Sequence, residues 1–307
     1  MSLQPQDRIQ QALFAYFCDF DAEALLERFH EAGQASEPGI VRNFLGTRIA
    51  PDVFPPILTP MAGMVEPVPH PGNWHADIAE WAAALRSVAL ARGTYRIVEL
   101  GCGWGCWIAN MGVAARRRGL DLDLIGIEAD RYHLASAEKT LRLNGFTASD
   151  YRLIHGVAGP RPGTAIFPIP EEDGTDWGGA AIFDPSPERL AKIRQGARYR
   201  ELPSIPLSEI VEEDMVDLLH IDIQGAEFDY VDGCFADISA YVKRVLIGTH
   251  SRVIEGRLFS RFLEQGWHLE MERPAIAPPV GGDPTIQIDG VQLWANPVTL
   301  AQDGIGS

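Results

Sequence analysis

The sequence has few cysteines and no long apolar run. Four cysteines in 307 residues are too few for the disulfide framework of a small secreted protein, and no CxxC pair marks a structural zinc site. No stretch of 18 or more apolar residues occurs, so we expect no membrane span. The N-terminus also lacks the basic-then-apolar order of a signal peptide. These absences favour a reducing, cytoplasmic compartment.

Basic residues are scarce relative to acidic ones. Lysine and arginine together number 26, against 42 aspartates and glutamates, and the net charge is −16. Phosphate backbones are repelled by such a surface, so we expect no nucleic-acid partner. A small-molecule substrate is the expected partner instead.

The first 74 residues differ in character from the rest of the chain. Apolar residues at three- and four-residue spacing predict a helix over Ile9 to Ala32. The proline-rich stretch from Glu37 to Gly72 excludes long helices and central strands, and we expect an extended arm there. Such an arm could bridge subunits, so a homo-oligomer is possible. A second helix is predicted from His75 to Arg92.

From Tyr95 onward, short apolar strands alternate with amphipathic helices. This order predicts an α/β fold, a doubly wound and mostly parallel sheet covered on both faces. Two strands near the end have no helix between them and predict an antiparallel terminal hairpin. We expect the sheet domain to span 75–297, with an insertion at 160–206 that serves as a lid or binding loop, and a flexible tail over 298–307.

The stretch VELGCGWGCW follows the first of these strands and places glycines at 101, 103 and 105. Glycine lets the chain turn sharply and lets a ligand approach the backbone. Dinucleotide enzymes use GxGxxG at this point, but Cys106 stands where the third glycine would fall. Glu99 also precedes the loop, and a carboxylate there would repel a pyrophosphate and attract an ammonium group. S-adenosylmethionine, which carries an ammonium, a sulfonium and a ribose but no phosphate, suits this pattern.

The second strand, LIGIEAD, ends in Glu128, where a carboxylate can accept both ribose hydroxyls. This feature alone fits NAD as well as S-adenosylmethionine, so the first loop decides between them. Ala129, which follows Glu128, and Val157 with Ala158, after the third strand, are placed around the nucleoside as well.

Several stretches together resemble one family: RIVELGCGWG, LIGIEAD, LRLNGF, HGVAG, VDLLHIDIQGAEFDYVDG and VLIGTH. They look like the FkbM-type methyltransferases, which belong to the class I S-adenosylmethionine-dependent enzymes. The resemblance covers about Tyr95 to Arg273 and implies methyl transfer to oxygen of a small molecule or sugar. Gln224 and Gly248 stand where the family has carboxylates, so no metal is predicted.

Methyl transfer to an alcohol needs a proton acceptor close to the reacting oxygen. Asp222 ends the fourth strand and His250 ends the fifth, so both are expected in the crevice. We predict His250 as proton acceptor or substrate orienter, and Asp222 as its partner or as a contact of the cofactor's methionine end. Glu227 and Trp177 are predicted to bind substrate.

Two alternatives stay open at this point. One is a non-catalytic nucleoside-binding module of the same fold, since two of the family's carboxylates are missing. The other is an NAD-dependent oxidoreductase, which Cys106 and Glu99 disfavour.

Overall fold

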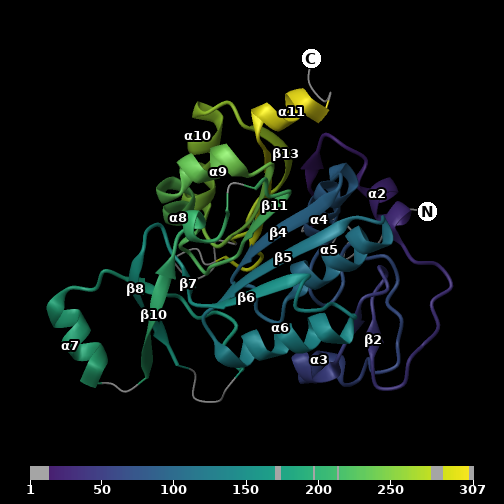
Figure 1. Ribbon diagram of the computed structural model, residues 1–307, viewed down its shortest axis with the longest axis horizontal. Helices are drawn as coiled ribbons and strands as arrows, with labels where there is room; N and C mark the ends of the chain where they lie inside the picture. Colours follow the sequence, from purple (N-terminus) through teal and green to yellow (C-terminus); the bar gives the residue numbers. More distant parts are fainter. Residues whose placement is uncertain (1–13, 170–173, 196–197, 213, 278–285, 304–307) are drawn as a thin grey trace.

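The computed structural model describes residues 14–169, 174–195, 198–212, 214–277 and 286–303. Its main sheet has eight strands in the order β1-β13-β14-β12-β11-β4-β5-β6 (Figure 1). In that order the strands are Phe17–Cys18, His268–Arg273, Gly290–Ala295, Arg244–Thr249, Leu218–Ile221, Thr94–Leu100, Asp121–Glu128 and Tyr151–His155. The predicted α/β class is confirmed.

The centre of this sheet is parallel and one side is antiparallel. β12, β11, β4, β5 and β6 pair in parallel, whereas β14 runs antiparallel to both β12 and β13. The predicted terminal hairpin is therefore confirmed. The chain moves outward from β4 to β6 and then returns to β11 on the other side of β4. This reversal of strand order opens a crevice beyond the carboxyl ends of β4 and β11, where such sheets bind ligands.

Helices cover both faces of the sheet. α4 (Ile78–Leu90), α5 (Cys106–Arg117) and α6 (Arg131–Leu143) contribute to the hydrophobic core on one face. α8 (Glu227–Gly233), α9 (Phe235–Tyr241) and α10 (Arg252–Glu264) pack on the other face, in a second core. The predicted helix from His75 to Arg92 corresponds to α4, which begins after a capping box formed by Asp77 and Glu80. Both faces are thus buried, as the short apolar strands require.

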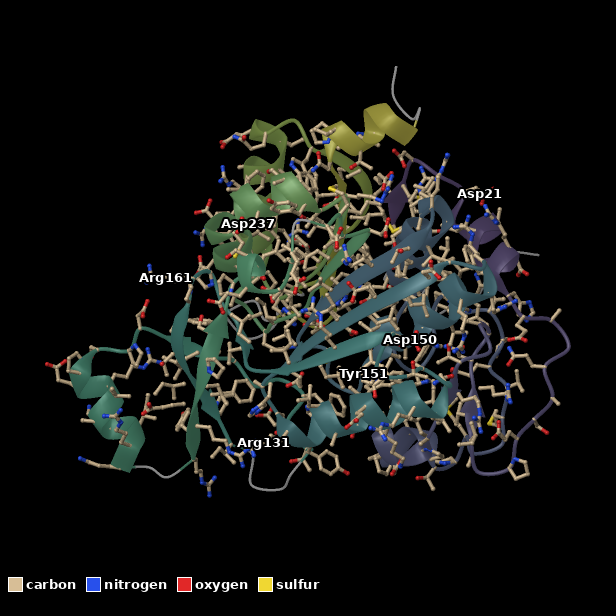
Figure 2. The ribbon with its side chains drawn as sticks, viewed as in Figure 1. Asp21, Arg131, Asp150, Tyr151, Arg161 and Asp237 are labelled. Carbon is tan, nitrogen blue, oxygen red and sulfur yellow. The ribbon has the colours of Figure 1, made fainter. Side chains whose placement is uncertain are left out.

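The N-terminal helix is shorter than predicted. α2 spans Ala22–Phe29 only, and its first turn is capped by Asp21, whose side chain accepts a hydrogen bond from the Ala24 amide at 2.9 Å (Figure 2). Residues 17–18 pair with β13 instead of continuing the helix. The predicted helix was wrong here because an aspartate N-cap starts a new helix and backbone pairing with a neighbouring strand replaces helical bonds. Part of the prediction, residues 9–13, lies outside the described residues.

The proline-rich arm contains short elements. They are β2 (Val41–Arg42), β3 (Arg48–Ile49), a 3-10 turn at Pro51–Val53 and α3 (Pro55–Leu58). β2 and β3 form a small hairpin, and several arm residues, including Phe44, Leu45 and Leu58, are fully buried in the core that α4 and α5 share. The arm is therefore packed on the sheet domain.

The insertion forms a second sheet together with β7 (Val157–Ala158), which precedes it. β7, β10 (Tyr199–Ile205), β8 (Gly163–Pro168) and β9 (Ile182–Phe183) pair in that order, and Figure 1 shows this sheet and α7 (Pro187–Gln195) projecting from one side of the molecule. Near the end of the chain, α11 (Pro297–Asp303) occupies part of the predicted tail. Among the described residues, the helices are all too short or too polar to cross a bilayer.

Candidate functional site

A cavity of about 350 Å³ opens at the carboxyl ends of β4, β5 and β11, which lie side by side in Figure 1. Its walls come from four parts of the chain: the glycine loop, the strand ends, the proline-rich arm and the insertion. Its volume falls at the lower end of the range for small-ligand pockets. The cavity thus lies at the reversal of strand order.

The glycine loop passes close to the turn after β11. Gly101, Gly103 and Gly105 have φ angles of +73°, +50° and +79°, a region that other residues adopt at a cost. A Cβ at Gly101 would lie 2.2 Å from the carbonyl oxygen of Asp222. Glycine is therefore required at 101 both by the turn and by the neighbouring backbone.

Glu99 holds the first turn of α5. Its two carboxylate oxygens accept hydrogen bonds from the amides of Trp107, at 3.2 Å, and Ile108, at 2.9 Å. The residue is only 2% exposed, and burial raises its pKa to about 8, although the two amides act in the opposite direction. Glu99 also lines the cavity, so it fixes the helix and faces the ligand space from one position.

Glu128 joins the second strand to the glycine loop. One oxygen accepts the Gly103 amide and the other accepts the Asp130 amide, both at 2.8 Å. Burial raises the pKa of this carboxyl group too. Ala129 and Val157, which were predicted beside the nucleoside, line the same cavity. Each carboxylate oxygen has a second lone pair for a ligand hydroxyl.

Asp222 lines the cavity, but His250 is not among the residues that do. The Nε2 atom of His250 lies 3.4 Å from Oδ1 of Asp222, and its Nδ1 atom lies 2.9 Å from Oε1 of Glu227. Burial lowers the pKa of His250, but the hydrogen bond to Glu227 and the neighbouring carboxylates outweigh it and raise this pKa to about 9. Burial raises the pKa of Asp222 to about 6. At neutral pH this places a protonated imidazole behind an ionised Asp222.

Glu227 is fully buried beneath the turn that follows β11. Its Oε1 atom accepts the amides of Gly225, at 2.8 Å, and Ile223, at 3.3 Å. This turn includes Gln224 at φ +55°, a strained angle for a side chain with a Cβ. Such a placement does not fit the predicted substrate contact of Glu227, because its carboxylate serves the backbone and His250 instead.

Among the described residues, Asp222, Glu227 and His250 form a group that could hold a metal ion. Ligand atoms from Asp222, Glu227 and His250 all lie within 4.8 Å of one another. Two carboxylates and an imidazole are ligands that several divalent metals accept. In this structure the imidazole lies between the two carboxylates and interacts with both of them.

Trp177, from the insertion, lies over the glycine loop. A Cβ at Gly103 would meet its ring at 3.2 Å, and its indole stacks on His133 of α6 with ring centroids 4.0 Å apart and planes at 20°. Phe54 of the arm packs against the same indole, with ring centroids 5.7 Å apart. The insertion therefore reaches over the glycine loop through Trp177, and the substrate contact of Trp177 stays a prediction.

Further aromatic side chains form the walls of the cavity. Trp74 stacks on Trp104 at 5.7 Å, and His75 contacts both Trp104 and Trp107. His220, in β11, contacts Trp107 at 5.4 Å. The cluster WGCW could have indicated an aromatic wall, but nothing local predicts that His220 faces it.

The charges of the cavity have one sign. The described residues that line it include four acids and neither lysine nor arginine; the acids are Glu99, Glu128, Asp176 and Asp222. A pyrophosphate would find no cationic partner among these residues. A ligand with positive charge and hydroxyl groups suits them.

Comparison with known proteins shows the family of the chain. Residues 92–262, more than half of the chain, match the model of the Methyltransferase FkbM domain. The chain is 51% identical over 272 residues to a protein from Jannaschia sp. (strain CCS1) named "Putative methyltransferase", covering 89% of this chain and 98% of that protein.

Two solved structures have a lower similarity. Methyltransferase FkbM from Methylobacillus flagellatus KT has 16% identity and a TM-score of 0.44, with 71% of this chain and 54% of that chain covered. The match thus spans about half the length of that protein. The C-terminal domain of precorrin-6Y C5,15-methyltransferase from Rhodobacter capsulatus has 14% identity and a TM-score of 0.37, covering 73% of this chain and 90% of that chain. The family match and the close relative carry the conclusion: the chain belongs to the FkbM methyltransferase family.

Proposed function

We propose that this methyltransferase uses S-adenosylmethionine as its methyl donor and transfers the methyl group to a hydroxyl of a small molecule or sugar. The observation that carries the donor assignment is the acidic lining of the cavity. Three buried or partly buried carboxylates, Glu99, Glu128 and Asp222, face it, and its described lining includes no lysine or arginine. The preference for oxygen rests on the family resemblance.

Each part of the cavity has a role in this proposal. Glu128 accepts hydrogen bonds from the ribose hydroxyls with the lone pairs that Gly103 and Asp130 leave free. Ala129 and Val157 provide apolar contacts for the adenine. Glu99 attracts the α-ammonium group. Trp177 covers the glycine loop and excludes water from the reacting centre.

The donor supplies an electrophilic methyl group on a sulfonium, and the protein supplies alignment and a proton acceptor. Asp222 is the acid that faces the cavity, and its pKa of about 6 leaves it mostly ionised at neutral pH. We therefore assign proton acceptance to Asp222. His250, already protonated, cannot accept a proton and instead orients Asp222 from behind. This assignment reverses the roles expected from the sequence.

Calorimetric titration tests the donor assignment. We expect the purified chain to bind S-adenosylhomocysteine and to show no heat with NAD. Binding of NAD in preference to S-adenosylhomocysteine would reject the proposal. A screen of sugar and phenolic alcohols with S-adenosylmethionine, read as S-adenosylhomocysteine formed, then tests the acceptor class. We expect an Asp222→Asn variant to bind the donor but to form no product. Product formed by the unmodified protein and lost in this variant separates an enzyme from a non-catalytic binding module.

A further inference from the structure

Three histidines line the cavity; His133 stacks against Trp177, whereas His75 and His220 both lie against Trp107 and have no role in the proposed chemistry. His220 lies in β11 and is 4% exposed, and its Nδ1 atom is buried without a hydrogen-bond partner among the described residues. An unpaired buried polar atom costs stability, so this nitrogen needs an explanation. His75 lies at the start of the segment leading into α4 and lines the same cavity.

His220 is the strand neighbour of Glu99. The two residues pair in register across β11 and β4, so their side chains project from the same face of the sheet, and their strands lie about 4.8 Å apart. Both side chains line the cavity. A ligand group held by Glu99 is therefore within a few ångströms of the His220 imidazole.

His75 lies beside Trp107 as well. The Trp107 ring centroid lies 5.9 Å from that of His75 and 5.4 Å from that of His220. The turn that carries His75 is fixed by Asn73, whose Oδ1 atom accepts the amides of His75 and Ala76 at 3.1 and 3.0 Å. The imidazole is thus held in position before a ligand arrives, which lowers the entropic cost of binding.

An amino-acid ligand carries its ammonium and carboxylate on one carbon atom. If Glu99 binds the ammonium, the carboxylate lies next to it, in a cavity without lysine or arginine among its described lining. Two of the neutral donors that line the cavity, both against Trp107, are the imidazoles of His75 and His220. We propose that His75 and His220 form the subsite for the α-carboxylate of the methyl donor, an inference that rests on the proposed function.

The protonation state of the imidazoles is consistent with this role. Burial lowers the pKa of His75 to about 4 and that of His220 to about 3, so both rings are neutral in the empty protein. Each neutral ring keeps one N–H donor. A neutral donor binds a carboxylate without placing a permanent cation beside the sulfonium that the site must also hold.

A series of three ligands tests the proposal by calorimetry. S-adenosylhomocysteine has the ammonium and the carboxylate, its decarboxylated analogue has the ammonium only, and 5′-methylthioadenosine has neither. We expect His220→Phe and His75→Phe each to weaken S-adenosylhomocysteine binding by about 10- to 100-fold, the value of a hydrogen bond to a charged group. Binding of the other two ligands should change by less than about 3-fold on the same reasoning.

The controls distinguish a misfolded variant, a wrong carboxylate subsite and a wrong donor. Unchanged binding of 5′-methylthioadenosine shows that a variant is folded, and His220→Asn, which keeps an N–H donor, should recover part of the lost affinity. His268→Phe is the matched control, because His268 pairs with Asp19 at 2.6 Å outside the cavity. Equal losses for all three ligands, or lost turnover at unchanged S-adenosylhomocysteine affinity, would overturn the carboxylate subsite. If the unmodified protein binds none of the three, the proposed donor itself is wrong.

Discussion

Glu128 accepts a hydrogen bond from the Gly103 amide at 2.8 Å, which ties the end of β5 to the loop that follows β4. A carboxylate at this place does two things: it shapes the loop, and it leaves lone pairs directed toward the cavity. The link is made between residues 25 positions apart in the chain. It is the clearest example here of a ligand-facing group that is also part of the scaffold.

Replacing Glu128 with Gln should therefore weaken nucleoside binding. Glutamine loses the negative charge and one acceptor for the ribose hydroxyls, and a hydrogen bond involving a charged group is worth about 1.5–3 kcal/mol. We expect S-adenosylhomocysteine affinity to fall by about 10- to 100-fold, measured by calorimetry. Glu138→Gln is the control, because the Glu138 side chain is partly exposed and pairs with Arg142 at 2.6 Å. Equal affinity of the two variants would contradict the role of Glu128.

Glu99 should make donor binding depend on pH. Its pKa is about 8 in the empty protein, and a bound ammonium group would lower that value. Below pH 8 the ligand must therefore displace a proton, so affinity should rise between pH 6 and pH 8, with proton release visible in buffers of different ionisation enthalpy. Glu99→Gln should bind more weakly and abolish this rise. A pH-independent affinity for the unmodified protein would exclude the ammonium contact.

Gly101 and Gly93 form a matched pair for testing the glycine loop. Both have a positive φ, +73° and +71°, but a Cβ at Gly101 would lie 2.2 Å from Asp222 O, whereas nothing lies within 4 Å of a Cβ at Gly93. Gly93→Ala should cost about 1–2 kcal/mol from the backbone angle alone. Gly101→Ala should cost more and also abolish S-adenosylhomocysteine binding. Urea unfolding and calorimetry measure the two effects, and similar stability losses would show that the backbone contact is unimportant.

Trp177 should stabilise the bound ligand from above the glycine loop. Trp177→Ala removes its contacts with His133 and Phe54 and opens the cavity to water. We expect slower donor turnover and faster dissociation of S-adenosylhomocysteine, by about 10-fold, with partial recovery in Trp177→Phe. Tyr199→Ala provides the comparison within the same insertion, because Tyr199 is 40% exposed and does not line the cavity. If Tyr199→Ala has the same effect, the insertion as a whole, rather than Trp177, is responsible.

His250 should make stability depend on pH above neutrality. Its pKa is raised to about 9 in the folded protein, so its contribution is complete below its unfolded pKa, near 6.5, and is lost as the pH rises through 9. The size of the effect is on the order of 1–3 kcal/mol. Urea unfolding of the unmodified protein and of His250→Gln should give a larger difference at pH 6.5 than at pH 10. A constant difference would mean that His250 is uncharged or unpaired.

The sequence predicted the strands and helices of the sheet domain well, and the N-terminal region less well. The acids at strand ends, Glu99, Glu128 and Asp222, line one cavity, because the carboxyl ends of parallel strands meet at one edge. The helix over Ile9 to Ala32 was wrong between residues 14 and 21, where residues 17–18 pair with β13. No local pattern contains the position of β13, which lies some 250 residues later.

The side chains behind the cavity show a second limit of the sequence. His250 and Glu227 carry the family's motifs, yet neither lines the cavity. Glu227 accepts backbone amides of the turn after β11. The direction of those amides depends on the backbone angles of Gln224 and Gly225. Spacing alone gives the end of a strand but does not give the direction of a side chain beyond it.

The sequence by itself determined the alternation of strands and helices, the bend at the glycines and the acids at the strand ends, because these follow from local spacing and from the backbone freedom of single residues. The tertiary structure alone decided that His220 stands beside Glu99, that Trp177 covers Gly103 and that Glu99 has a raised pKa. These properties depend on strand order and on burial from several directions. Both arise only when segments distant in the chain pack together and exclude water.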